Sequence, residues 1–188
     1  MKKISLVVLL LTVSVMVSTL VFSADINTEL MDAIRAKNVQ KSKDAISKGA
    51  NINANINSVN ESGITPLMIA ATSDVTVEIG KLLIEKGADV NAKDLLGWTP
   101  LIHATYSGQT AFVKLLIKKR ADVNARSNTG WTPLMYAAYS GRVEIGKLLI
   151  EKGADVNAIS RTGETALSIA QSRSESDFAD LLRNKNAK

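Results

Sequence analysis

Apolar and polar residues recur along this chain with a period of about 33 residues. The phrase Thr-Pro-Leu begins at Thr65, Thr99 and Thr132, and a related phrase begins at Thr165, so the successive steps are 34, 33 and 33 residues. Internal repetition of this length is typical of proteins in which one small structural unit is copied along the chain. The pattern therefore predicts a stack of repeats.

Each copy of the pattern predicts two helices. Threonine at the start of the phrase caps a helix by accepting a hydrogen bond from a free backbone N–H, and the proline that follows has no N–H to lose. A second helix is predicted over segments such as residues 143–150, and Gly153 suits the left-handed conformation that ends a helix. Neither helix buries its apolar side alone, so neighbouring units are expected to share one core.

A second phrase closes each unit in phase with the first. Gly-Ala-Asp-Val-Asn-Ala or a close variant ends at Ala92, Ala125 and Ala158, and an earlier copy ends at Ala54. With both phrases in phase, the chain from residue 25 onwards resembles the ankyrin-repeat family. The resemblance implies an all-α repeat solenoid, an ankyrin stack of helix–turn–helix units with hairpin fingers. It divides the chain into about five units, with degenerate caps at both ends, at residues 25–61, 62–94, 95–127, 128–160 and 161–188.

Some residues depart from the pattern and predict weak points. Arg120 stands where the other units have the helix-ending glycine, and a left-handed arginine costs roughly 1 kcal/mol. Gly80 and Gly146 lie inside second helices, where each is expected to cost about 1 kcal/mol relative to alanine. Residues 55–63 form a longer, loop-like connection that we expect to be a mobile first finger. Polar residues in the first unit, Ser42 among them, are expected to face water and close the stack.

Aromatic residues mark the expected binding surface. In ankyrin proteins the fingers and the exposed side of the first helices form a concave surface where partners dock, and the resemblance carries this surface over to the present chain. Four of its five Trp and Tyr residues fall at two repeated positions of adjacent units, namely Trp98, Trp131, Tyr106 and Tyr139. Trp and Tyr often anchor interfaces. The residues expected to border them on two fingers are Lys93, Leu95, Leu96, Arg126, Asn128 and Thr129. A structural alternative is that the tryptophans merely cover apolar surface between fingers.

The N-terminus predicts export. Lys2 and Lys3 precede an uncharged segment, residues 4–22, and small residues follow at Ser23 and Ala24. This order is typical of a signal peptide, predicted over residues 1–23, that leaves a mature chain of residues 24–188. An uncleaved membrane anchor is the alternative, because 19 uncharged residues come close to the roughly 20 that span a bilayer. The protein is therefore expected in the periplasm or outside the cell, with the membrane involved only through the transient signal.

Composition changes the picture in two ways. The absence of cysteine means that no disulfide staples the exported domain, so its stability depends on packing. Removal of the signal lowers the formal net charge from +5 to +3, and nucleic-acid binding would need a concentrated basic face. No nucleic acid is expected as a partner.

Catalytic chemistry is poorly represented. With one histidine and no cysteine, the chain lacks most nucleophile–base pairs and metal-ligand clusters, so we expect no catalytic residue, metal or cofactor. His103 has apolar neighbours and is expected to be a packed or hydrogen-bonded residue. Asp89, Asp122 and Asp155 recur at one point of each unit, which favours a turn-forming role in each finger.

Two functions remain open from the sequence. The first is a protein-binding module, monomeric when free, that stabilises, inhibits or escorts another exported protein. The second is a glycan-binding module of the cell envelope, because Trp and Tyr faces also stack on sugar rings. Enzymatic activity is a distant third. The partner's identity is not encoded in any motif, and the choice between the first two rests on analogy because a fold does not determine a function.

Overall fold

The structure is a computed structural model that describes residues 26–53, 63–73 and 76–185. Within these residues ten helices form five consecutive pairs, and no strand is present. The first helix of each pair covers residues 26–35, α3 (Pro66–Ala70), α5 (Pro100–Tyr106), α7 (Pro133–Tyr139) and α9 (Ala166–Ser172). The second helix of each pair is α2 (Val39–Ser47), α4 (Val77–Glu85), α6 (Thr110–Lys118), α8 (Val143–Glu151) or α10 (Ser176–Arg183).

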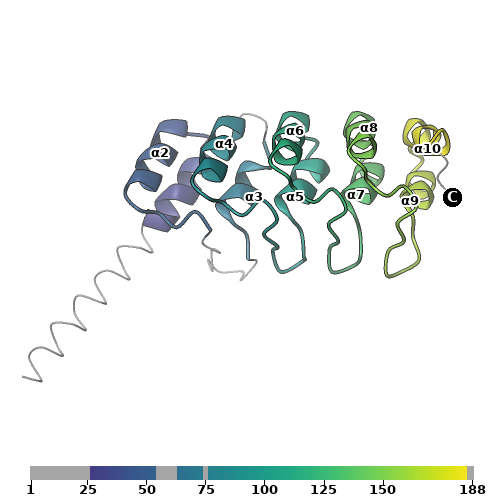
Figure 1. Cartoon of the computed structure of the whole chain (residues 1–188), viewed down its shortest axis with the longest axis horizontal. Helices are drawn as coiled ribbons and strands as arrows, with labels where there is room; N and C mark the ends of the chain where they lie inside the picture. The colour runs from purple at the N-terminus through teal and green to yellow at the C-terminus, as the bar shows by residue number, and fades with distance from the viewer. Residues whose placement is uncertain (1–25, 54–62, 74–75, 186–188) are drawn as a thin grey trace, which may run out of the picture.

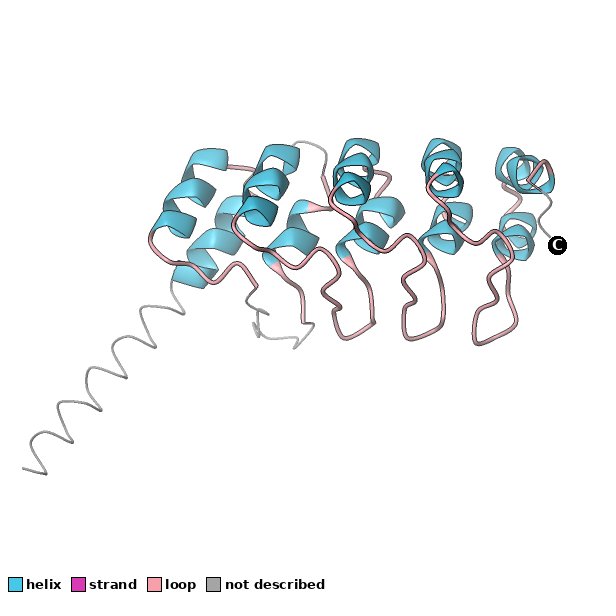
Figure 2. Cartoon of the chain, viewed as in Figure 1, coloured by secondary structure: helices cyan, strands magenta, loops and turns pink. Residues whose placement is uncertain are grey.

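The helices stand in two parallel rows. In Figure 1 the second helices, α2, α4, α6, α8 and α10, form the upper row, and the first helices form the row beneath them. Figure 2 shows the loops that connect successive helix pairs projecting beyond the row of first helices, away from the row of second helices. We call each of these loops a finger, and the three described in full cover residues 86–99, 119–132 and 152–165. The all-α solenoid predicted from the repeat is confirmed.

The opening threonines cap the first helices as predicted. The side chain of each accepts a hydrogen bond from the backbone N–H three residues later, at 3.2 to 3.4 Å. The four capping residues are Thr65, Thr99, Thr132 and Thr165. Proline follows directly in the first three, so each helix begins at a residue that has no N–H to satisfy.

A continuous core runs between the two rows. Leu101, Leu134 and Leu149 are fully buried, and the buried apolar side chains form one cluster from Ile26 to Leu182. Each helix pair contacts the next along the stack. No unit therefore has a core of its own, which is the property expected of a repeat array.

Gly80 and Gly146 are not weak points, and the prediction made for them was wrong. A Cβ atom on Gly80 would lie 2.4 Å from Cζ of Phe112 in the next unit, and one on Gly146 would lie 2.6 Å from the ring of Phe178. Both rings are fully buried. The missing side chain makes the space that each ring fills, so close packing between units outweighs the lower helix propensity of glycine.

Arg120 adopts the left-handed conformation predicted for it. Its φ is 66°, whereas Gly87 and Gly153 at the same position of neighbouring units have φ values of 93° and 88°. A side chain at positive φ is sterically unfavourable, so this helix end is strained relative to its neighbours.

Hydrogen bonds between fingers set their register. Asp89, like its repeats, accepts a bond from the backbone N–H two residues later, at 2.9 Å, which confirms the predicted turn role. The side-chain oxygen of an asparagine in one finger accepts a bond of 2.9 Å from the backbone N–H of that aspartate in the next. The asparagines are Asn53, Asn91 and Asn124. Neighbouring fingers are thus held in fixed positions, which matters for the side chains on them.

The first unit differs from its prediction at one residue. Ser42 is fully buried and its hydroxyl donates to the carbonyl of Asn38 at 2.9 Å, so it does not face water. Ser42 occupies the position of Gly80 and Gly146, which points toward the next unit rather than out of the stack. The predicted signal peptide, residues 1–23, and residues 54–62 of the first finger lie outside the described residues.

Candidate functional site

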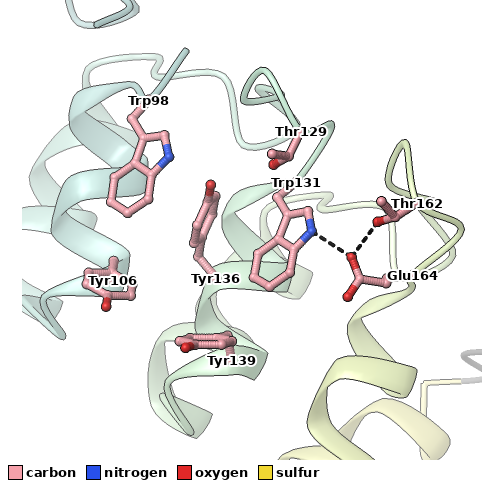
Figure 3. A pocket seen from close by; sticks show the side chains of 8 residues that line it. All are labelled: Trp98, Tyr106, Thr129, Trp131, Tyr136, Tyr139, Thr162 and Glu164. Carbon is pink, nitrogen blue, oxygen red and sulfur yellow. Dashed lines mark hydrogen bonds between the residues drawn. The ribbon is translucent and has the colours of Figure 1, made fainter. Parts of the chain in front are cut away.

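The predicted aromatic residues converge on one open hollow. Trp98 and Trp131 stand on the stems of neighbouring fingers, and Tyr106 and Tyr139 stand on the first helices α5 and α7 (Figure 3). The hollow has a volume of about 470 Å³. It is lined by Trp98, Tyr106, Thr129, Trp131, Tyr136, Tyr139, Thr162 and Glu164. We call it the aromatic hollow.

Polar groups at the finger tips position the two tryptophans. The backbone N–H of Trp98 donates to the buried carboxylate of Asp94 at 2.8 Å, and the backbone N–H of Trp131 donates to the hydroxyl of Ser127 at 3.1 Å. Asp94 also accepts from the N–H of Leu96, so one carboxylate closes this finger. Because each stem is bonded to the tip turn of its own finger, the two indole rings are presented from fixed backbone positions.

Tyr136 is the centre of the cluster and was missed by the sequence analysis. It is only 6% exposed, and its ring centroid lies 4.7 Å from that of Trp98 and 5.1 Å from that of Trp131. Figure 3 shows its ring between the two indoles. Tyr136 precedes Tyr139 by three residues on α7, and residues three apart share a helix face. That spacing was the available signal, and all five Trp and Tyr residues of the chain belong to this one cluster.

Tyr106 and Tyr139 form the lower edge of the aromatic hollow. Their rings are stacked with centroids 6.4 Å apart, and Tyr106 remains 43% exposed. The guanidinium of Arg173, a residue that is not part of the lining, lies over the ring of Tyr139 at 4.3 Å from its centroid. A cation–π contact of this kind holds the Tyr139 ring in place.

Glu164 supplies the only carboxylate among the lining residues. One of its oxygens, Oε2, accepts bonds from the Thr162 hydroxyl at 2.7 Å and from the Trp131 indole N–H at 3.0 Å, with Ser160 more distant at 3.3 Å. The Thr162 bond, followed by the Trp131 bond, lowers the pKa of Glu164 below its usual value, although partial burial opposes the shift. The carboxylate therefore stays ionised and fixes the indole of Trp131.

The other predicted border residues lie on the fingers but outside the lining, with Thr129 as the exception. Asn128 donates to the carbonyl of Leu95 at 2.7 Å, Lys93 donates to the carbonyl of Arg126 at 3.1 Å, and Arg126 donates in turn to the next finger. Leu95 and Leu96 are exposed at a finger tip. Most of these residues connect fingers to each other, so the prediction that they border a binding surface stays a prediction.

His103 has the structural role expected of it. Its Nε2 lies 3.0 Å from Oδ2 of Asp94, and its ring packs edge-on against Trp98 with centroids 5.2 Å apart. It therefore supports the finger stem that carries Trp98. Across the part of the chain that the structure describes, no group of three or more His, Cys, Asp or Glu residues is arranged to hold a metal ion. Nor does any described helix combine the length and apolar character needed to cross a membrane.

The sequence is similar to a known family model and to parts of several known proteins. The sequence model of a family described as "Ankyrin repeats (3 copies)" matches residues 30–127 and 124–188. The rat protein "Ankyrin repeat and SAM domain-containing protein 6" is 37% identical over 86 residues, which are 45% of this chain and 9% of the relative. The mouse "Protein phosphatase 1 regulatory subunit 12A" is 51% identical over 49 residues, 26% of this chain and 5% of the relative. A Rickettsia felis protein named for its ankyrin repeats is 42% identical over 60 residues, 30% of this chain and 25% of the relative.

Proposed function

This chain belongs to the ankyrin-repeat family, and we propose that it is a non-catalytic module that binds another protein through the aromatic hollow. Ankyrin repeats bind other proteins, and one of the matched relatives is named as a regulatory subunit. The chain spans less than a tenth of the length of its two mammalian relatives, so their partners are not transferred to it. The observation that carries the proposal is the gathering of every Trp and Tyr residue at one open hollow.

The energetics of the hollow favour a binding role. A large aromatic side chain left half-exposed on a folded protein forfeits part of the free energy that its burial would contribute, about 25 cal/mol per Å² of apolar surface. Trp98, Trp131 and Tyr139 are half-buried and Tyr106 is exposed, although each contacts other rings. A partner that covers these rings recovers that free energy. Because the stems and fingers are already held in place, little ordering is needed on binding.

We further propose that the protein works outside the cytoplasm and that its partner is another exported protein, which it stabilises or inhibits. The support is the N-terminal order of lysines, uncharged segment and small residues. Intact-mass measurement of protein recovered from the periplasm or medium is expected to give a chain that begins near Ala24. Recovery only of chain that retains Met1, and only in membranes, would favour the alternative of an anchored protein.

Affinity capture with the mature chain, followed by mass spectrometry, tests the binding role. Tyr106→Ala is the variant of choice, because Tyr106 is the most exposed ring and its loss removes the least packing. Truncation of an aromatic residue that anchors an interface often costs about 2 kcal/mol, which is a loss of affinity of roughly 30-fold. The matched control is Ile159→Ala, which removes an exposed apolar side chain that does not line the hollow and is expected to leave capture unchanged.

The double change Trp98→Ala and Trp131→Ala is expected to abolish capture, with a loss of about a thousandfold when non-additivity is allowed for. Both residues directly precede an opening threonine, outside the helix positions that build the shared core, and this placement alone predicts a nearly intact fold. Trp131 instead packs against the core and bonds to Glu164, and Trp98 contacts Tyr136, so a lower melting temperature is expected as well. Capture and melting are therefore measured on the same samples. Retained capture by a folded double variant, or capture of peptidoglycan in place of a protein, would refute the proposal.

A further inference from the structure

We propose that the aromatic hollow receives a cationic side chain of the partner, a lysine or an arginine, beside the carboxylate of Glu164. This inference rests on the proposed protein-binding function and specifies which chemical group of the partner enters the hollow. It follows from three observations: the composition of the walls, the state of the one lining carboxylate, and the absence, among the described residues, of a cation paired with it.

The walls of the hollow are mostly aromatic. Five of the eight lining residues are Trp or Tyr, and they meet one another edge-on, tilted or stacked, with centroids 4.7 to 6.4 Å apart. The face of an aromatic ring carries a negative potential that attracts ammonium and guanidinium groups within about 6 Å of its centroid. The contact of Arg173 with the ring of Tyr139 is an example of this attraction within the same chain.

Glu164 adds a formal negative charge at one edge of these rings. Its Oε2 takes all three hydrogen bonds, from Thr162, Trp131 and Ser160. No described residue donates to Oε1, and none of the ion pairs among the described residues includes Glu164. The carboxylate is held in one orientation with one oxygen unpaired, and the bonds that hold it also lower its pKa.

Charge complementarity distinguishes a cation from the other possible occupants. An apolar side chain would cover Oε1 without giving it a hydrogen bond, and an unsatisfied charged group is costly to bury. An anionic side chain would be repelled by Glu164. A lysine or arginine places its apolar stem against the rings and its charge against both the ring faces and the carboxylate.

The order of residues at one repeated position puts the carboxylate at one end of the hollow. The position before the opening threonine holds Trp98, Trp131 and then Glu164 in successive units, so a row of indoles ends in a carboxylate (Figure 3). The cation is therefore expected to lie at the Trp131 end, against Trp131 and Tyr136 and beside Glu164, rather than at Trp98 or over Tyr139, where Arg173 already lies.

The two indole N–H signals of the chain provide a direct test by nuclear magnetic resonance, because the protein has only two tryptophans. The full-length 15N-labelled protein is titrated separately with N-acetyl-lysine methylamide, N-acetyl-arginine methylamide and N-acetyl-norleucine methylamide, the last being an uncharged analogue of lysine. N-acetylglucosamine serves as the sugar probe. At least one cationic probe is expected to shift the Trp131 indole signal more than that of Trp98, with an affinity at least tenfold above those of norleucine and the sugar.

Variants then isolate the carboxylate. Glu164→Gln keeps the side-chain shape and a hydrogen-bond acceptor for Trp131, and it is expected to weaken cation binding at least tenfold. Glu151→Gln removes the same charge from the outer helix α8 and is expected to change nothing. If Glu164→Gln fails to fold, binding to the unmodified protein is compared on acidification, where protonation of Glu164 is expected to weaken the cationic probe and to leave norleucine unaffected.

Several outcomes overturn the inference: norleucine or the sugar binding as well as the cations, Glu164→Gln binding cations like the unmodified chain, or both charge variants having the same effect. Failure of this inference can be distinguished from failure of the proposed function. If protein capture depends on Tyr106 but is unchanged by Glu164→Gln, the protein-binding function is supported and the cation inference fails. Cation binding together with no Tyr106-dependent protein capture would instead remove the protein-binding module.

Discussion

Replacing Gly80 with alanine separates local helix propensity from packing between repeats. Gly80 lies within α4, where alanine is favoured over glycine by about 1 kcal/mol in an isolated helix. In the folded stack, however, the new Cβ would lie 2.4 Å from Cζ and 2.8 Å from Cε2 of Phe112. Carbon atoms approach without repulsion only to about 3.5 Å, so the ring or the helix must move by roughly 1 Å.

The size of the effect follows from how little the ring can move. Phe112 is fully buried on α6, and displacing it disturbs the side chains packed around it. Inserting one carbon into a well-packed core typically costs about 1–3 kcal/mol. Subtraction of the propensity gain of about 1 kcal/mol leaves an expected net destabilisation of up to roughly 2 kcal/mol. Gly146→Ala, which faces Phe178 at 2.6 Å, is expected to behave in the same way.

Urea denaturation monitored by circular dichroism measures the change in unfolding free energy. Lys81→Gly is the control for propensity, because Lys81 is exposed on the same helix and its replacement is expected to cost slightly less than 1 kcal/mol. Combining Gly80→Ala with Phe112→Leu, which shortens the clashing side chain, is expected to cost at least about 1 kcal/mol less than the sum of the single changes. A stabilised Gly80→Ala protein, or strict additivity, would refute the packing argument.

Three further predictions concern single residues. Arg120→Gly is expected to raise the unfolding free energy by roughly 0.5–1 kcal/mol, because glycine tolerates the φ of 66°. A lower unfolding free energy in urea denaturation would mean instead that Arg120 makes a stabilising contact. Leu149→Asp places an unpaired charge in a fully buried site and is expected to lower the unfolding free energy by several kcal/mol. Because the core is shared, amide hydrogen exchange is expected to become faster in neighbouring units too. An unchanged denaturation midpoint would contradict the shared core. The lowered pKa of Glu164 means that its ionised form contributes stability above the ordinary glutamate pKa of about 4.3, and that this contribution is lost as the pH falls through the folded-state value. The stability difference between the parent and Glu164→Gln is accordingly expected to shrink on acidification, and a constant difference would oppose this assignment.

The sequence alone determined the features that are encoded within one repeat. The helix starts at Thr65, Thr99, Thr132 and Thr165 follow from the chemistry of capping, which involves residues three positions apart. The left-handed Arg120 followed from comparing one position across copies. Four members of the aromatic cluster were found in the same way, since Trp98, Trp131, Tyr106 and Tyr139 fall at repeated positions. Such features are local or periodic, so they can be read without knowing how units pack.

Only the tertiary structure decided what happens between repeats. The ring of Phe112 fills the space beside Gly80, and the burial of Ser42 depends on the neighbouring unit. The carboxylate of Glu164 accepts a hydrogen bond from an indole 33 residues earlier in the chain. Tyr136 joins the aromatic cluster because the stacking of units brings its helix against the stem that carries Trp98. These contacts depend on the offset and rotation between neighbouring units. That geometry is set by the packing of whole surfaces, because each unit must fill the shape that the next one leaves.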